Sequence, residues 1–150
     1  MKRVLLLVLF ALGVSWSAAF AADRATPDEA KAMAEKAAAF LKENGPEKAF
    51  AAFHAKDGGF QDRDLYVTVQ DSQGMMVCHG TTPALEGKSM LSLKDVDGKA
   101  FNVEIQAVKD TGWVSFKWLN PVTKLVEPKK NYEIRVGDYL VGVGAYTSAQ

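Results

Sequence analysis

The sequence of 150 residues has a single cysteine, Cys78, and only two histidines. One cysteine cannot form an intramolecular disulfide, and no Cys-x-x-Cys pair exists for zinc binding, redox exchange or haem attachment. The sequence has no phosphate-binding loop, and no nucleophile lies in a context typical of catalysis. We therefore expect a protein that is not an enzyme and that carries no metal and no cofactor.

An excess of charge of either sign is also lacking. The chain has 18 basic and 18 acidic residues. Loss of a leader containing Lys2 and Arg3 would leave 16 basic against 18 acidic residues, a net charge of −2. Such a balance offers no electrostatic footprint for nucleic acid, and no basic amphipathic segment suits a membrane surface. We expect no nucleic-acid partner.

Long hydrophobic runs are confined to the first residues of the chain. Met1-Lys2-Arg3 precedes an apolar run over residues 4–14, and small residues then lead to Ala19-Phe20-Ala21. This order is typical of a cleaved signal peptide, whereas a membrane-spanning helix needs about 20 apolar residues. We predict a signal peptide over residues 1–22, one domain over residues 23–150, and a periplasmic protein with no membrane span after cleavage. An uncleaved membrane anchor is the alternative.

Two helices are predicted next. Thr26 can cap the first, Pro27 suits its first position, and Glu29 completes a capping box. Apolar residues then recur at helical spacing: Ala30, Met33, Ala34, Ala37, Phe40 and Leu41. Asn44-Gly45-Pro46 ends this helix. A second, short helix ends at His54, where a protonated imidazole would interact favourably with the helix dipole.

Five later segments are predicted to be strands, and residues 65–71 and 113–118 among them show the alternation typical of a strand. The five segments cover residues 65–71, 75–79, 113–118, 126–135 and 139–146. A crossing loop over residues 80–89 and a short helix over residues 100–109 separate the second segment from the third. Helices grouped apart from hairpin-joined strands predict an α+β domain with an antiparallel sheet of about five strands.

Several blocks of residues occur in an order shared with a known family. They are residues 64–74, 77–80, 83–88, 95–99, 112–114, 118–123, 127–132 and 142–146. The closest block is Trp118-Leu119-Asn120-Pro121-Val122-Thr123, followed by Glu127-Pro128-Lys129 and Tyr132. Together these blocks resemble the single Cache domains of the second type, over essentially the whole chain after the leader.

The resemblance implies a PAS-like extracellular sensor fold. In that fold a long N-terminal helix packs on a five-stranded antiparallel sheet, whose concave face holds a small ligand, often a short carboxylate. Such domains usually lie between two membrane helices of chemoreceptors or histidine kinases. Since this sequence ends at Gln150, four residues after the last predicted strand, we expect a free-standing binding protein that reports to a separate membrane receptor or kinase.

A carboxylate site needs a cationic or neutral hydrogen-bond donor and apolar walls. The residues predicted to bind the ligand are Tyr66, His79, Trp118, Lys129 and Tyr132. Lys129 and Tyr132 occupy matching positions of the family motif, and His79 ends a strand beside the crossing loop. Lys129 and Tyr132 are three residues apart, so a regular strand would point them to opposite faces. Either a bulge intervenes or only one of them faces the ligand.

Structural roles compete with these assignments. His79 could be a strand-end histidine with satisfied hydrogen bonds, Lys129 could belong to a solvated pair with Lys130, and Trp118 could be a core residue. Cys78 is expected to point away from His79 as a buried, inert thiol.

Binding of a small organic acid such as acetate, propionate, pyruvate or lactate, linked to signal transduction or chemotaxis, is the favoured function. The alternative is an adaptor that docks onto a membrane receptor and has no functional pocket.

Overall fold

The computed structural model describes residues 24–147 of the chain. The predicted signal peptide therefore lies outside the described residues. Within residues 24–147, no helix is both long enough and apolar enough to cross a membrane.

Helix α1 (Pro27–His54) begins as the sequence predicts. The Thr26 hydroxyl accepts a hydrogen bond from the Glu29 N–H, and the Glu29 carboxylate accepts one from the Thr26 N–H. The predicted break is a kink, because Gly45 adopts φ 76° and ψ 167° before Pro46, after which the helix resumes. The two predicted helices are thus the two arms of α1.

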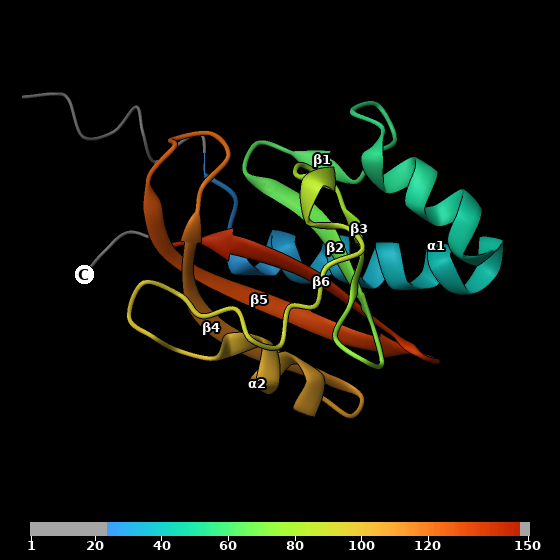
Figure 1. Ribbon diagram of the computed structural model, residues 1–150. Coiled ribbons are helices and arrows are strands. Elements are labelled where there is room, and N and C mark those ends of the chain that lie inside the picture. The colour runs from blue at the N-terminus through green and yellow to red at the C-terminus, as the bar shows by residue number, and fades with distance from the viewer. Residues whose placement is uncertain (1–23, 148–150) are drawn as a thin grey trace, which may run out of the picture.

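The sheet is antiparallel and lies against α1 (Figure 1). Its strands are β1 (Gln61–Asp62), β2 (Leu65–Asp71), β3 (Met76–His79), β4 (Thr111–Leu119), β5 (Val126–Val136) and β6 (Tyr139–Tyr146). The strand order is β1-β2-β6-β5-β4, and β3 also pairs with β2. The predicted α+β, PAS-like arrangement is confirmed. The sheet has six strands rather than five, because the two-residue β1 pairs with β2.

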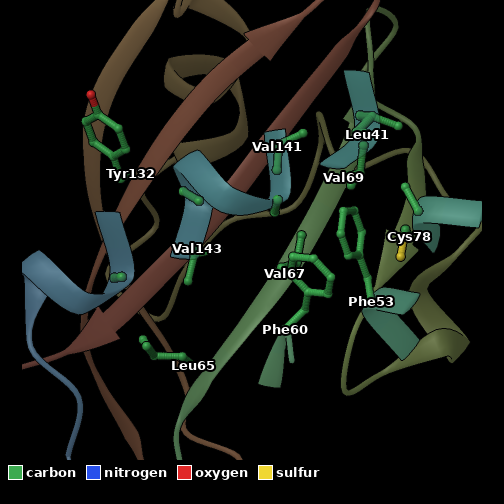
Figure 2. Packing of buried hydrophobic residues seen from close by; sticks show 14 of the residues in the cluster. Leu41, Phe53, Phe60, Leu65, Val67, Val69, Cys78, Tyr132, Val141 and Val143 are labelled. Atoms are coloured by element: carbon green, nitrogen blue, oxygen red, sulfur yellow. The ribbon is translucent and has the colours of Figure 1, made fainter. Parts of the chain in front are cut away.

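The main core lies between α1 and one face of the sheet (Figure 2). Alternate residues of β2 and β6 point into it: Leu65, Val67, Val69, Val141, Val143 and Ala145. Small side chains on α1, among them Ala30, Ala34 and Ala37, are fully buried and let the helix approach the sheet closely. Phe53 and Phe60 close one end with their rings edge to face, 4.8 Å apart.

The opposite face of the sheet is covered by the crossover between β3 and β4. This segment contains η1 (Pro83–Leu85) and α2 (Phe101–Ala107). Phe101 of α2 stacks on Phe116 of β4 with ring centroids 4.1 Å apart, and Leu140 of β6 joins this second cluster. The two faces are therefore chemically different, and the space under the crossover is where the polar side chains gather.

Candidate functional site

A cavity of about 30 Å³ lies between the crossover and the sheet. Four of the five predicted site residues line it: Tyr66, His79, Trp118 and Lys129. They come from β2, β3, β4 and β5, so every one of these strands contributes a side chain from the same face. The pairing of the strands brings together residues that are up to 63 positions apart in the sequence.

Tyr132 lies on the other face of the sheet. Strand β5 pairs with β4 in a regular register, with Lys129 opposite Phe116 and Tyr132 opposite Trp113. No bulge therefore lies between Lys129 and Tyr132. Residues three apart on a regular strand point to opposite faces. The Tyr132 ring packs in the core beside α1 (Figure 2) and is not in the cavity lining. Of the two motif residues, only Lys129 faces the cavity.

The Lys129 ammonium is enclosed by aromatic rings. The residue is only 3% exposed, and Nζ donates a hydrogen bond of 2.8 Å to the Tyr66 hydroxyl. Nζ also lies 4.0 Å from the ring centroid of Tyr66 and 5.0 Å from that of Tyr146. Among residues 24–147, no carboxylate comes within 4.0 Å of Lys129 Nζ.

A directed chain of hydrogen bonds leads away from Lys129. The Tyr146 hydroxyl donates to the Leu119 carbonyl at 2.8 Å, so the Tyr66 hydroxyl, 3.1 Å from it, acts as donor to Tyr146. Burial, together with the neighbouring Tyr66, raises the pKa of Tyr146 and keeps its phenol protonated. The sequence analysis missed Tyr146, although it lies directly opposite Lys129 on the neighbouring strand.

His79 is a neutral donor. Burial, and then the nearby charge of Lys129, lower its pKa to about 4. Its Nδ1 accepts a hydrogen bond of 3.0 Å from the Thr82 N–H, which leaves the ring proton on Nε2. The ring is stacked on Tyr66 with centroids 5.0 Å apart. His79 therefore presents an N–H group at the cavity and adds no charge to it at neutral pH.

Amide side chains occupy the other end of the cavity wall. The Gln70 side chain donates a hydrogen bond of 2.7 Å to the side-chain oxygen of Asn102, Oδ1. The Asn131 side chain donates one of 2.9 Å from Nδ2 to the Glu133 carboxylate. Asn102 Nδ2 and Asn131 Oδ1 are buried without a hydrogen-bond partner in the described residues. Both residues line the cavity. Unpaired buried polar groups are rare, and this part of the cavity lining carries one unpaired donor and one unpaired acceptor among the described residues.

The Single Cache domain 2 family model matches residues 16–149. The chain belongs to this family. A comparison with curated proteins found no match.

Three solved structures have a similar fold. A methyl-accepting chemotaxis protein from Vibrio parahaemolyticus RIMD 2210633 is 27% identical, covers 79% of this chain and 86% of its own, and superposes with a TM-score of 0.67. A Cache chemosensory domain described in terms of carboxylic acid recognition is 22% identical, with coverage of 81% and 92% and a TM-score of 0.71. A periplasmic sensor domain of a chemotaxis protein is 24% identical, with coverage of 81% and 90% and a TM-score of 0.60.

The motif at the β4–β5 turn of this Cache domain is mainly structural. Arg24 donates two hydrogen bonds of 2.7 and 2.9 Å to Glu127, and Asn120 donates a third of 2.8 Å. Burial acts to raise the pKa of Glu127, but the Arg24 and Asn120 hydrogen bonds outweigh it and leave the pKa below its ordinary value. The Asn120 side chain also accepts from the Val122 N–H. These buried groups shape the turn.

Two glycines of β6 make room for polar side chains of the neighbouring strand β5. A Cβ atom at Gly144 would lie 2.5 Å from Lys129 Cε and would collide with the Asn131 amide oxygen. A Cβ atom at Gly142 would collide with the Glu133 carboxylate. Without a Cβ atom at these two positions, the side chains of Lys129, Asn131 and Glu133 fit directly against the β6 backbone.

Substitution Gly144→Ala is expected to destabilise the domain by about 1–3 kcal/mol, since a methyl group would be forced into a filled space. It should also weaken ligand binding by displacing Lys129. Denaturant unfolding measures the first effect. Gly112→Ala in β4 is the matched control, because a Cβ there would lie 3.4 Å from Val108, an ordinary contact. Equal stabilities for the two variants would show that β6 relaxes freely.

Proposed function

We propose that this Cache domain is a periplasmic sensor that binds a short carboxylate in the cavity under the crossover. The observation that carries the proposal is the Lys129 ammonium, which is buried, faces the cavity and has no carboxylate within 4.0 Å in the described part of the chain. A buried charge is costly unless it is paired. An anionic ligand would supply the missing partner.

The surrounding groups suit a carboxylate. Lys129 would provide a charge-assisted hydrogen bond, and the neutral His79 would donate a second from Nε2. Tyr66 and Trp118 provide apolar walls. The cavity is small, at about 30 Å³, and acetate is the smallest of the predicted ligands.

Larger acids would also form hydrogen bonds with the amide side chains of Asn102 and Asn131, which line the cavity. The hydroxyl of lactate both donates and accepts, as Asn131 Oδ1 and Asn102 Nδ2 require. Carboxylic acid recognition by one similar structure, a Cache chemosensory domain, supports the same ligand class. We infer that the acid is bound and released unchanged, as in a sensor, and that the bound state is read by a receptor or kinase in signal transduction or chemotaxis.

Acetate at about 100 times its dissociation constant is expected to stabilise the domain by about 2.7 kcal/mol, a rise in melting temperature on the order of 5–10 °C. Propionate, pyruvate and lactate should be compared in the same thermal-shift series. Acetamide is the control, since it has the shape of acetate without the charge, and it should leave the melting temperature unchanged. Failure of all four acids at millimolar concentration would reject the proposal and favour an adaptor without a ligand.

A further inference from the structure

A second cluster of reactive side chains lies on the other side of β3. Cys78 and His79 are adjacent in this strand and point to opposite faces: His79 lines the cavity, whereas Cys78 is buried beside α1 (Figure 2). His54, the last residue of α1, and Glu86, the residue after η1, approach Cys78. One ligand atom from each of the three residues lies within 4.8 Å of the others.

The spacing of these atoms is close to that of a tetrahedral metal centre. His54 Nε2 lies 3.6 Å from Cys78 Sγ and 2.6 Å from Glu86 Oε1. Zinc bonds of about 2.3 Å to sulfur and about 2.1 Å to nitrogen and oxygen would put nitrogen about 3.6 Å from sulfur and about 3.4 Å from oxygen. The nitrogen-to-sulfur distance already agrees. The Glu86 carboxylate would have to move away from His54 by about 0.8 Å to admit the ion.

The same geometry argues against a nucleophilic cysteine. Cys78 and Glu86 both approach Nε2 of His54, whereas a catalytic triad uses one imidazole nitrogen for the nucleophile and the other for the acid. Burial, and then the charge of Glu86, raise the pKa of the Cys78 thiol to about 12. A thiol of that pKa is a poor nucleophile, but a bound metal ion displaces its proton.

We propose that His54, Cys78 and Glu86 bind a divalent transition-metal ion of the zinc class. A thiolate, an imidazole and a carboxylate are ligand types that zinc accepts, and three protein ligands leave the fourth position to water. His54 and Glu86 are only partly buried, which gives the ion a path from solvent. The backbone N–H of His79 donates a hydrogen bond of 2.8 Å to the Glu86 carboxylate and orients it, as outer-shell hydrogen bonds orient metal ligands.

Binding converts the Cys78 thiol to a thiolate and releases its proton to the solvent. Isothermal titration of tag-free, chelator-stripped protein with zinc chloride, in two buffers of different ionisation enthalpy, should therefore show one ion bound and at least about one proton released at pH 7. Cobalt chloride used as a second probe should produce a thiolate-to-cobalt absorption band. Binding without proton release and without this band would overturn the assignment of Cys78.

Variants His54→Gln, Glu86→Gln and Cys78→Ser should each weaken zinc binding at least about tenfold, because even outer-shell changes cost 10–100-fold. The first two affect partly exposed residues and test the site even if the buried Cys78→Ser variant fails to fold. Glu47→Gln, an exposed residue on α1, is the matched control and should bind zinc as the parent does. Equal affinity in the His54 and Glu86 variants, or no zinc binding by the parent at micromolar concentration, would overturn the proposal.

Discussion

Replacing Lys129 with methionine is expected to weaken acetate binding at least about 30-fold. Removing one partner of a buried, hydrogen-bonded charge pair costs about 2–5 kcal/mol, and each 1.4 kcal/mol is a factor of ten in affinity. Methionine approximates the length and apolar volume of the lysine side chain. The rings of Tyr66 and Tyr146, which lie beside Lys129, therefore keep a packing partner. Isothermal titration with acetate measures the loss directly.

The ligand-free stability of the Lys129→Met variant separates lost binding from lost folding. The parent buries an ammonium whose hydrogen bond to Tyr66 replaces only part of its hydration. The variant should therefore melt at or above the temperature of the ligand-free parent. Lys130→Met is the matched control: Lys130 is the next residue of β5, and its Nζ lies over the Trp113 ring at 4.8 Å, away from the cavity. Parent-like acetate affinity in the Lys129 variant would remove the basis of the proposed site.

At pH 8, the substitution Glu133→Gln is expected to stabilise the domain by about 3 kcal/mol relative to the parent. Glu133 is 2% exposed, and burial raises its pKa to about 7, against the weaker opposing effects of the Asn131 hydrogen bond and the Lys129 charge. The ordinary value is 4.5, so the shift is about 2.5 units at 1.36 kcal/mol each.

The direction of the pH dependence follows from the protons bound in each state. Between pH 4.5 and pH 7 the unfolded chain has lost the Glu133 proton while the folded protein retains it, so the parent loses stability as the pH rises through this window. Glutamine does not titrate. The two proteins should therefore be equally stable near pH 4 and should differ by the full amount above pH 7.

Urea unfolding at pH values from 4 to 8 measures this difference. His79 has the opposite effect, because its lowered pKa of about 4 makes stability fall as the pH drops below 6.5. That contribution is present in parent and variant alike and cancels in the comparison. Glu43→Gln, at an exposed position of α1, is the matched control. A constant offset between parent and Glu133→Gln at all pH values would mean that Glu133 titrates normally.

Much of the fold could be predicted because its signals are local. The Thr26 capping box, the break at Gly45 and the alternation in β2 and β4 each depend on residues a few positions apart, and all are present in the structure. The two-residue β1 was missed, because a segment that short has no periodicity of its own. The helix predicted over residues 100–109 is the shorter α2, Phe101–Ala107.

The site was only partly predictable. Strand alternation correctly indicated that Lys129 and Tyr132 could share a face only if a bulge intervened, and the regular β4–β5 register resolves that question in favour of Lys129. Asn102 and Tyr146 were missed, because Asn102 reaches the cavity through the crossover and Tyr146 meets Lys129 through strand pairing, and no spacing in the sequence indicates either. The His54, Cys78 and Glu86 cluster was missed for the same reason, with 32 positions between His54 and Glu86.

The sequence by itself determined the family, the helix cap and kink, and which side chains of each strand share a face, since backbone geometry makes these properties depend on near neighbours. Only the tertiary structure decided which strand faces meet the crossover, that Tyr132 belongs to the α1 core, and that Lys129 is buried without a carboxylate partner in the described residues. Those outcomes depend on contacts between distant segments, where the packing of α1 on one face and of α2 on the other assigns each side chain to the core or to the cavity.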